Sequence, residues 1–435
     1  MGPPTVLAHG LSVQGEVPVP IWWVAIAAAA VLVLSFLILG RTWQESRLED
    51  GGWGRRLSRR IDRTLGGLEW PARVLGVVIA VTVWAAALFG PLFAIENVAP
   101  FAVYIAFWVG GIIVSAVVGD VWAVLSPFET AVRLVNRGRT VDRTPVPELG
   151  LWPAAVLLFG FAWLELVHPS ATDPRTIGIA ITVYAMVIAV GATWWGQSWV
   201  WSAEAFGALF RLLAAMAPLH RDDEGRLRLR PPFVGLARVP PDRGTAALVI
   251  VALGTTTFDG VTRLPFWTEL AARRTGWAMV PIATLVMLAV VLVMGGIFLA
   301  AIGYAARRTD RPADRLAEDF AHSLVPIVFA YAVAHYFSLL VLEGQRTYIL
   351  GSDPFGRGWD LFGTASWMVS YEIVSTALIG AIQVAAIVVG HLAGVVLAHD
   401  RAVALLEPKL AVASQRRLLD AMVAYTVSGL VLLLG

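Results

Sequence analysis

The sequence predicts an all-α fold, a polytopic bundle of about ten transmembrane helices. Hydrophobic residues make up 58% of the 435-residue chain and the mean hydropathy is +0.72, whereas charged residues make up only 15%. Soluble domains contain about 45–50% apolar and about 25% charged residues. The apolar residues also fall in blocks of about 20, which is the length that crosses a hydrocarbon core of about 30 Å. We therefore expect one integral membrane domain over residues 1–435.

Ten spans follow from these blocks. The first is expected to remain uncleaved because residues 1–20 lack the basic region of a signal peptide. The sixth is short and the ninth is long. The expected ranges are 21–40, 72–95, 101–119, 151–168, 177–196, 245–259, 277–304, 321–342, 367–397 and 418–434.

The distribution of Lys and Arg predicts the orientation. The loops after the odd-numbered spans contain 26 Lys and Arg residues, and the other loops contain 6. Basic loops remain on the cytoplasmic side. We therefore expect a multi-pass protein of the inner (cytoplasmic) cell membrane with both termini extracytoplasmic. In this orientation residues 1–20 and the loop 343–366 lie outside, and residues 197–244 lie inside.

Two cytoplasmic stretches, 121–139 and 200–216, have the pattern of amphipathic helices in the membrane interface. Each begins with Val-Trp, and Trp side chains favour the headgroup level while Arg side chains extend to water. The following segment, 219–244, contains Pro and Gly residues that argue against a long helix. We expect 197–244 to form a cytoplasmic helix and loop rather than a separate domain.

Composition also limits the chemistry. The absence of cysteine excludes disulfides, thiolate metal ligands and cysteine nucleophiles. The net charge of +2 is explained by the basic loops, so nucleic acid is not an expected partner. The expected partners are the lipid bilayer and a small-molecule or metal-ion ligand. Protein partners are not predicted.

Polar residues on four spans fall at one predicted depth. Glu165, Asp259, His335 and Gln383 each lie 14 residues from the cytoplasmic boundary of their span, a rise of about 21 Å. His168 is one turn beyond Glu165. Ionisable groups inside a membrane cost roughly 2.5–3.5 kcal/mol each and usually serve function. This outer layer is the candidate site, with His335, His168, Asp259 and Glu165 as ligands of a divalent metal ion.

A second polar group is expected near the cytoplasmic face. It contains His322, His399 and Asp400, which we expect to reach water, with Asp120 at the end of the third span and His391 between the two layers. His322 and His335 are 13 residues apart, about 20 Å, so one metal ion cannot bind both. His9 precedes the first span and is a further possible ligand of the outer layer.

Two outer segments bear on access to that layer. The stretch GTTTFDG (254–260) is expected to end the sixth span early, with unwound backbone that lines a cavity. The loop 343–366 is Gly-rich and contains charged residues. It either covers the outer layer or simply connects two spans.

Several stretches resemble a family of bacterial polytopic membrane proteins known as fenitrothion hydrolases, over nearly the whole chain. The resemblance implies hydrolysis of a phosphotriester, and it implies no particular catalytic residues. The stretches are LAHGL (7–11), WPAAVLLFGFAWLELV (152–167), TFDG (257–260), AHYFSLLV (334–341), SDPFG (352–356) and GHLAGVVLAHDRA (390–402).

Three functions remain open from the sequence. The first is transport of a metal ion or small solute, since protonatable groups on several helices are typical of ion paths. The second is a membrane metallohydrolase, in which a metal ion activates water against a lipophilic phosphotriester. The third and least favoured is a b-type dihaem cytochrome, with His322 paired to His399 and His335 paired to His168.

Overall fold

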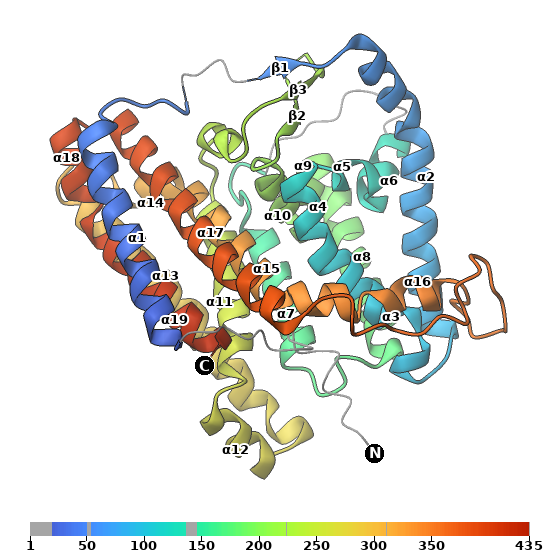
Figure 1. Cartoon of the computed structure of the whole chain (residues 1–435). Helices are drawn as coiled ribbons and strands as arrows, with labels where there is room; N and C mark the ends of the chain where they lie inside the picture. Colours follow the sequence, from blue (N-terminus) through green and yellow to red (C-terminus); the bar gives the residue numbers. More distant parts are fainter. Residues whose placement is uncertain (1–19, 50–53, 136–145, 223, 310, 435) are drawn as a thin grey trace.

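The computed structural model describes residues 20–49, 54–135, 146–222, 224–309 and 311–434. His9, a possible ligand of the outer layer, lies outside these residues. The described chain is mainly helical and contains one small sheet, which confirms the predicted helical bundle (Figure 1).

Seven helical stretches are long and apolar enough to cross a membrane, or eight if a bent pair counts as one span, among the described residues. The ten-span count and the orientation therefore remain predictions, because α7 (Trp152–Leu166) and α19 (Arg416–Leu434) fall outside this set. The seven are α1 (Ile21–Thr42), α2 (Arg59–Phe89), the stretch Val98–Val117, α8 (Pro174–Trp195), α13 (Val280–Ala306), the stretch Ala313–Leu342 and α17 (Thr376–Leu405).

Two of these stretches are composite. Val98–Val117 consists of α3 (Val98–Pro100), a π-helical segment (Phe101–Val109) and α4 (Gly110–Val117). Ala313–Leu342 consists of α14 (Ala313–Ala321), a short 3-10 turn (His322–Leu324) and α15 (Val325–Leu342).

Helices α11 (Thr245–Val261) and α15 form the interior of the bundle. In Figure 1, α1, α13, α17 and α19 lie on one side of them and α2 and α8 on the other. Glycines on α17 permit close contact with α15. A Cβ atom on Gly390 would lie 2.2 Å from the Cβ of Ala330, so only glycine fits there. Small residues of this kind allow two membrane helices to approach closely.

Helix α11 corrects one expectation, because residues 254–260 do not unwind. The hydroxyls of Thr255, Thr256 and Thr257 donate to carbonyls one turn earlier, at 2.7–2.8 Å, and so remain compatible with a helix. Gly254 is required by packing, since a Cβ atom there would lie 2.7 Å from Val291. The chain turns only after Val261, and α12 (Pro265–Arg273) continues at 75° to α11.

The ninth span is also displaced from its expected range of 367–397. Helix α17 begins at Thr376, where the Ser375 hydroxyl accepts from the Leu378 backbone N–H, and it continues to Leu405. His399 and Asp400 therefore belong to the helix and not to the loop that follows it.

The first predicted interface helix, 121–139, is replaced by two short ones, α5 (Trp122–Leu125) and α6 (Pro127–Val135), separated by Ser126. Residues 136–139 lie outside the described chain.

The second expected interface helix forms α9 (Gln197–Ala203) and α10 (Ala205–Ala214), and α10 is not a surface helix. Nine of its ten residues are buried, all except Arg211. Its apolar residues pack against α4 and α7 and so leave no face for the headgroup region.

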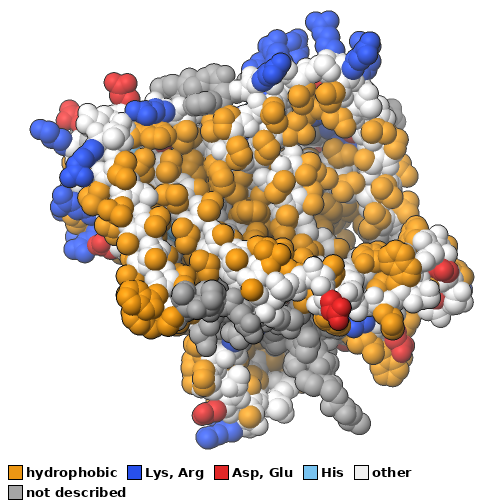
Figure 2. Space-filling view, viewed as in Figure 1, with side chains coloured by type: hydrophobic (Ala, Val, Ile, Leu, Met, Phe, Trp, Pro, Cys, Tyr) orange, Lys and Arg blue, Asp and Glu red, His pale blue; other side chains and the backbone are white. Residues whose placement is uncertain are grey.

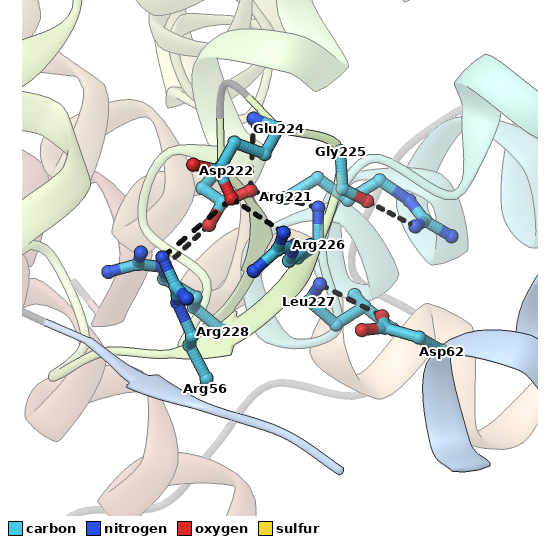
Figure 3. Close-up of polar contacts among 9 residues, drawn as sticks. All are labelled: Arg56, Asp62, Arg221, Asp222, Glu224, Gly225, Arg226, Leu227 and Arg228. Atoms are coloured by element: carbon cyan, nitrogen blue, oxygen red, sulfur yellow. Dashed lines mark hydrogen bonds and ion pairs between the residues drawn. The ribbon is translucent and has the colours of Figure 1, made fainter. Parts of the chain in front are cut away.

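A small antiparallel sheet covers the arginine-rich end of the molecule (Figure 1). β2 (Leu219–Arg221) and β3 (Leu227–Leu229) form a hairpin, and β1 (Arg55–Arg56) pairs with β3. Figure 3 shows how side chains support it. Asp222 accepts from the Arg226 backbone N–H and pairs with Arg228 at 2.7 Å, while Asp62 of α2 accepts from the Leu227 backbone N–H.

The molecular surface agrees with a membrane protein. Figure 2 shows Lys and Arg side chains gathered at the end that bears the sheet, above a broad band of hydrophobic side chains. At the opposite end, α16 (Gln345–Gly351) precedes an extended loop, 352–375. Gln345 joins this loop to the bundle by hydrogen bonds to the carbonyl and the N–H of Ser370.

Candidate functional site

A buried carboxylate and a buried histidine form the centre of the candidate site. Asp259 of α11 and His335 of α15 are 0% and 1% exposed, and Asp259 Oδ2 lies 2.6 Å from His335 Nε2. They meet because α11 packs against α15 in the interior of the bundle. The carboxyl and the imidazole are therefore joined by a direct hydrogen bond.

Further polar groups surround this pair. The Glu165 carboxyl of α7 is buried and interacts electrostatically with Asp259 and with Tyr104 of the π-helical segment. The guanidinium of Arg263, just beyond α11, interacts electrostatically with Tyr336. Arg263 Nε and Nη2 are buried and have no hydrogen-bond partner within the described chain. The site therefore combines two carboxyls, one imidazole and one cation.

Hydroxyl groups extend the site away from Asp259. The Tyr336 hydroxyl donates a long hydrogen bond, 3.4 Å, to Asp259 Oδ2. The Tyr331 ring stacks between His335, at 6.2 Å, and Tyr425 of α19, at 5.7 Å. The Tyr425 hydroxyl lies 2.8 Å from Thr257 Oγ1. No sequence pattern points to these hydroxyl residues, because Tyr and Thr are common on any apolar helix.

His168 does not join the other three predicted ligands. Helix α7 ends at Leu166, so the spacing of one helical turn from Glu165 does not apply. The His168 ring lies against Trp163 and Trp277, and its Nδ1 accepts from the Ser170 backbone N–H at 3.2 Å. The described residues bring no three His, Asp or Glu side chains into a group that could hold a metal ion.

Gln383 of α17 is fully buried, and neither its Nε2 nor its Oε1 has a hydrogen-bond partner in the described part of the chain. Gly394 packs on Ser323, and Gly390 packs on Ala330. This antiparallel register places Gln383 at about the level of His335, as the depth estimate predicts. The Gln383 side-chain amide therefore lies at the level of the site without a hydrogen-bond partner in the described chain.

The second polar group does not reach water as expected. His322, His399 and Asp400 are all buried. Asp400 accepts hydrogen bonds from the Trp43 indole, the Ser46 hydroxyl and two backbone N–H groups of the segment 43–48. This segment folds over the end of α17 and excludes solvent, which the sequence did not indicate.

The histidines of this group have separate partners. His399 Nε2 hydrogen-bonds the Trp43 carbonyl, and His322 Nδ1 hydrogen-bonds the Asp319 carbonyl. His391 Nδ1 donates to the Ile387 carbonyl, and its ring lies 5.8 Å from Tyr425. Asp120 is exposed and accepts from the Ala123 backbone N–H. These contacts do not support the pairing of His322 with His399 around a haem.

No known protein family, curated protein or solved structure matches this chain. The function must therefore be inferred from the site itself. Its groups are ionisable side chains, and they lie between apolar helices where a single uncompensated charge is costly. A proton that passes from one of these three groups to another leaves the total charge of the site unchanged.

Proposed function

We propose that this membrane protein moves protons across the bilayer, with Asp259, His335 and Glu165 as the proton-binding groups. The buried Asp259–His335 pair is the observation that supports this proposal most strongly. Ionisable residues within membrane helices typically mark proton relays and ion paths. A neighbouring second carboxyl supplies the next group to which a proton can pass.

The number and kind of ligands favour protons over a divalent metal ion. A metal ion in a protein normally takes at least three side-chain ligands or several oxygens. Asp259 and His335 are joined directly, and the Arg263 cation lies close by. A fixed cation opposes the binding of a second one, whereas it stabilises the ionised state of a carboxyl that must release its proton.

Proton flux into liposomes tests the proposal directly. The purified protein is reconstituted with a pH-sensitive dye inside, and a potassium diffusion potential, negative inside, is imposed with valinomycin. We expect proton entry well above that of protein-free liposomes. Asp259→Asn should reduce it to the protein-free rate, because an amide cannot exchange the proton.

Asp420→Asn is the matched control. Asp420 lies on α19, 63% exposed and paired with Arg417, so the same chemical change should leave the flux intact. Wild-type flux no faster than that of empty liposomes would contradict the proposal. Equal flux in wild type and Asp259→Asn would also contradict it.

Phosphotriester hydrolysis, which the family resemblance implies, remains the alternative. It would use Glu165 or Asp259 as a general base toward a water molecule. Release of a nitrophenol from a nitrophenyl phosphotriester by the protein in detergent, lost in Asp259→Asn and kept in Asp420→Asn, would favour the hydrolase over the proton carrier.

A further inference from the structure

An apolar pocket of about 660 Å³ lies between α11, α13, α15 and α19. Its wall along α13 runs from Leu285 to Phe298, a rise of about 20 Å. Leu285 is 66% exposed, so the pocket opens on the side of the bundle. A pocket of this length covers about two thirds of a 30 Å hydrocarbon core.

The polar atoms at the pocket are hydrogen-bond acceptors. The single hydroxyl hydrogen of Thr257 is donated to the Leu253 carbonyl at 2.7 Å. With the Thr257 hydrogen directed at the Leu253 carbonyl, Tyr425 is the donor in its 2.8 Å bond to Thr257, and its oxygen retains capacity to accept. Ser428 likewise donates to the Ala424 carbonyl at 2.8 Å and retains an acceptor oxygen.

The charge of the pocket restricts its occupant further. No charged side chain lines it within the described chain, and its only polar lining side chains are Thr257, Tyr425 and Ser428. A phosphate or carboxylate headgroup would find neither a cation nor a donor hydrogen there. An uncharged group that donates a hydrogen bond complements both oxygens.

We propose that this pocket binds a neutral long-chain alcohol, whose hydroxyl donates to Tyr425 Oη while its chain lies along α13. The ligand enters from the lipid through the open side of the bundle. Its hydroxyl end lies beside Tyr425, whose ring stacks on Tyr331 next to His335. The binding site does not depend on the proposed proton transport, and it is tested without measuring flux.

Photolabelling in phosphatidylcholine nanodiscs tests this site. The probe is a long-chain primary alcohol with a diazirine in its chain, and labelled peptides are mapped by mass spectrometry. We expect labelling concentrated on α13 and α19. The unlabelled alcohol should compete roughly fivefold better than its methyl ether, because the ether has no hydroxyl hydrogen to donate to Tyr425.

Variants distinguish the pocket from the general lipid surface. Ala289→Trp fills the pocket from α13 and should reduce labelling at least tenfold. Val183→Trp places the same ring on the exposed surface of α8, away from the pocket, and should leave labelling unchanged. Tyr425→Phe should remove most of the preference for alcohol over ether.

Three results would overturn the proposal. One is labelling spread evenly over α1, α2, α8 and α13, which indicates occupation by bulk lipid only. The second is undiminished labelling of Ala289→Trp. The third is equal competition by the alcohol and its ether, which excludes the hydroxyl as the recognised group.

Discussion

Asp259 and Asp400 are both fully buried carboxylates on long helices, yet their surroundings differ. Asp400 accepts from an indole, a hydroxyl and backbone N–H groups, which are donors that do not titrate near neutral pH. Asp259 is joined to a histidine and lies near a second carboxyl. The comparison separates a carboxylate that holds the chain together from one whose partners can exchange protons.

The largest effect on stability is expected for Asp400→Asn. The amide brings its own donor hydrogens against the donors of segment 43–48 and removes the charge that strengthens those bonds. Leaving several buried groups unsatisfied should lower the free energy of unfolding by about 3–5 kcal/mol. An unfolding titration in mixed micelles measures this free energy. A decrease of less than about 1 kcal/mol would mean that Asp400 does not hold segment 43–48 against α17.

The same change at Asp259 should separate function from stability. Asp259→Asn removes a charge that is costly to bury, and the amide can still hydrogen-bond a neutral His335 imidazole, so the loss of the attraction is largely offset. We expect the free energy of unfolding to change by less than about 1 kcal/mol in the same titration, although proton flux is lost. A destabilisation as large as that of Asp400→Asn would remove the distinction between the two carboxylates.

A smaller change of opposite sign is expected for Gln383→Met, which keeps the side-chain length and removes both polar atoms. Because neither atom has a partner within the described chain, the substitution should raise the free energy of unfolding by about 1 kcal/mol. Lower stability in the unfolding titration would show that Gln383 binds water or a solute at the level of His335.

The smallest effect is expected at the surface sheet. The backbone N–H of Arg226 and the nearby Arg228 lower the pKa of Asp222 below its ordinary value near 3.8. The ionised carboxylate therefore stabilises the hairpin at neutral pH, and this contribution is lost as pH falls through the lowered pKa. Asp222→Asn should speed hydrogen exchange of the β3 amides roughly twofold at neutral pH, as expected for an exposed pair.

The matched measurement is the ratio of variant to wild-type exchange rates over a range of pH. It should approach one in acid, where the wild-type carboxyl is also neutral. A ratio that stays constant with pH would show that the charge of Asp222 does not support the hairpin.

The sequence predicted the parts of this molecule that depend on hydropathy and on helical rise. The helical bundle is confirmed, and the depth estimate placed Asp259 and His335 in one layer, where the structure finds them 2.6 Å apart. It failed for His168 because the helix ends at Leu166, two residues too early for the assumed spacing. The Gly and Thr content of residues 254–260 predicted unwound backbone there, but the threonine hydroxyls instead form hydrogen bonds within the helix.

Other features depend on contacts between distant residues, which no local pattern reveals. The burial of Asp400 results from segment 43–48, more than 350 positions away along the chain. The position of Tyr425 beside Thr257 depends on how α19 packs against α11. Such placements follow from the packing of the whole bundle, and hydropathy alone does not determine them.

The connection between α1 and α2 is fastened at two places on one end of the molecule, to Asp400 of α17 and to β3 through β1. Only six residues lie between Leu48 and Arg55, a reach of about 25 Å at full extension. The short span restricts how far the left and right helices of Figure 1 can part at the arginine-rich end. Any wide separation of the two groups of helices must therefore occur at the opposite end of the molecule, with the arginine-rich end as the hinge.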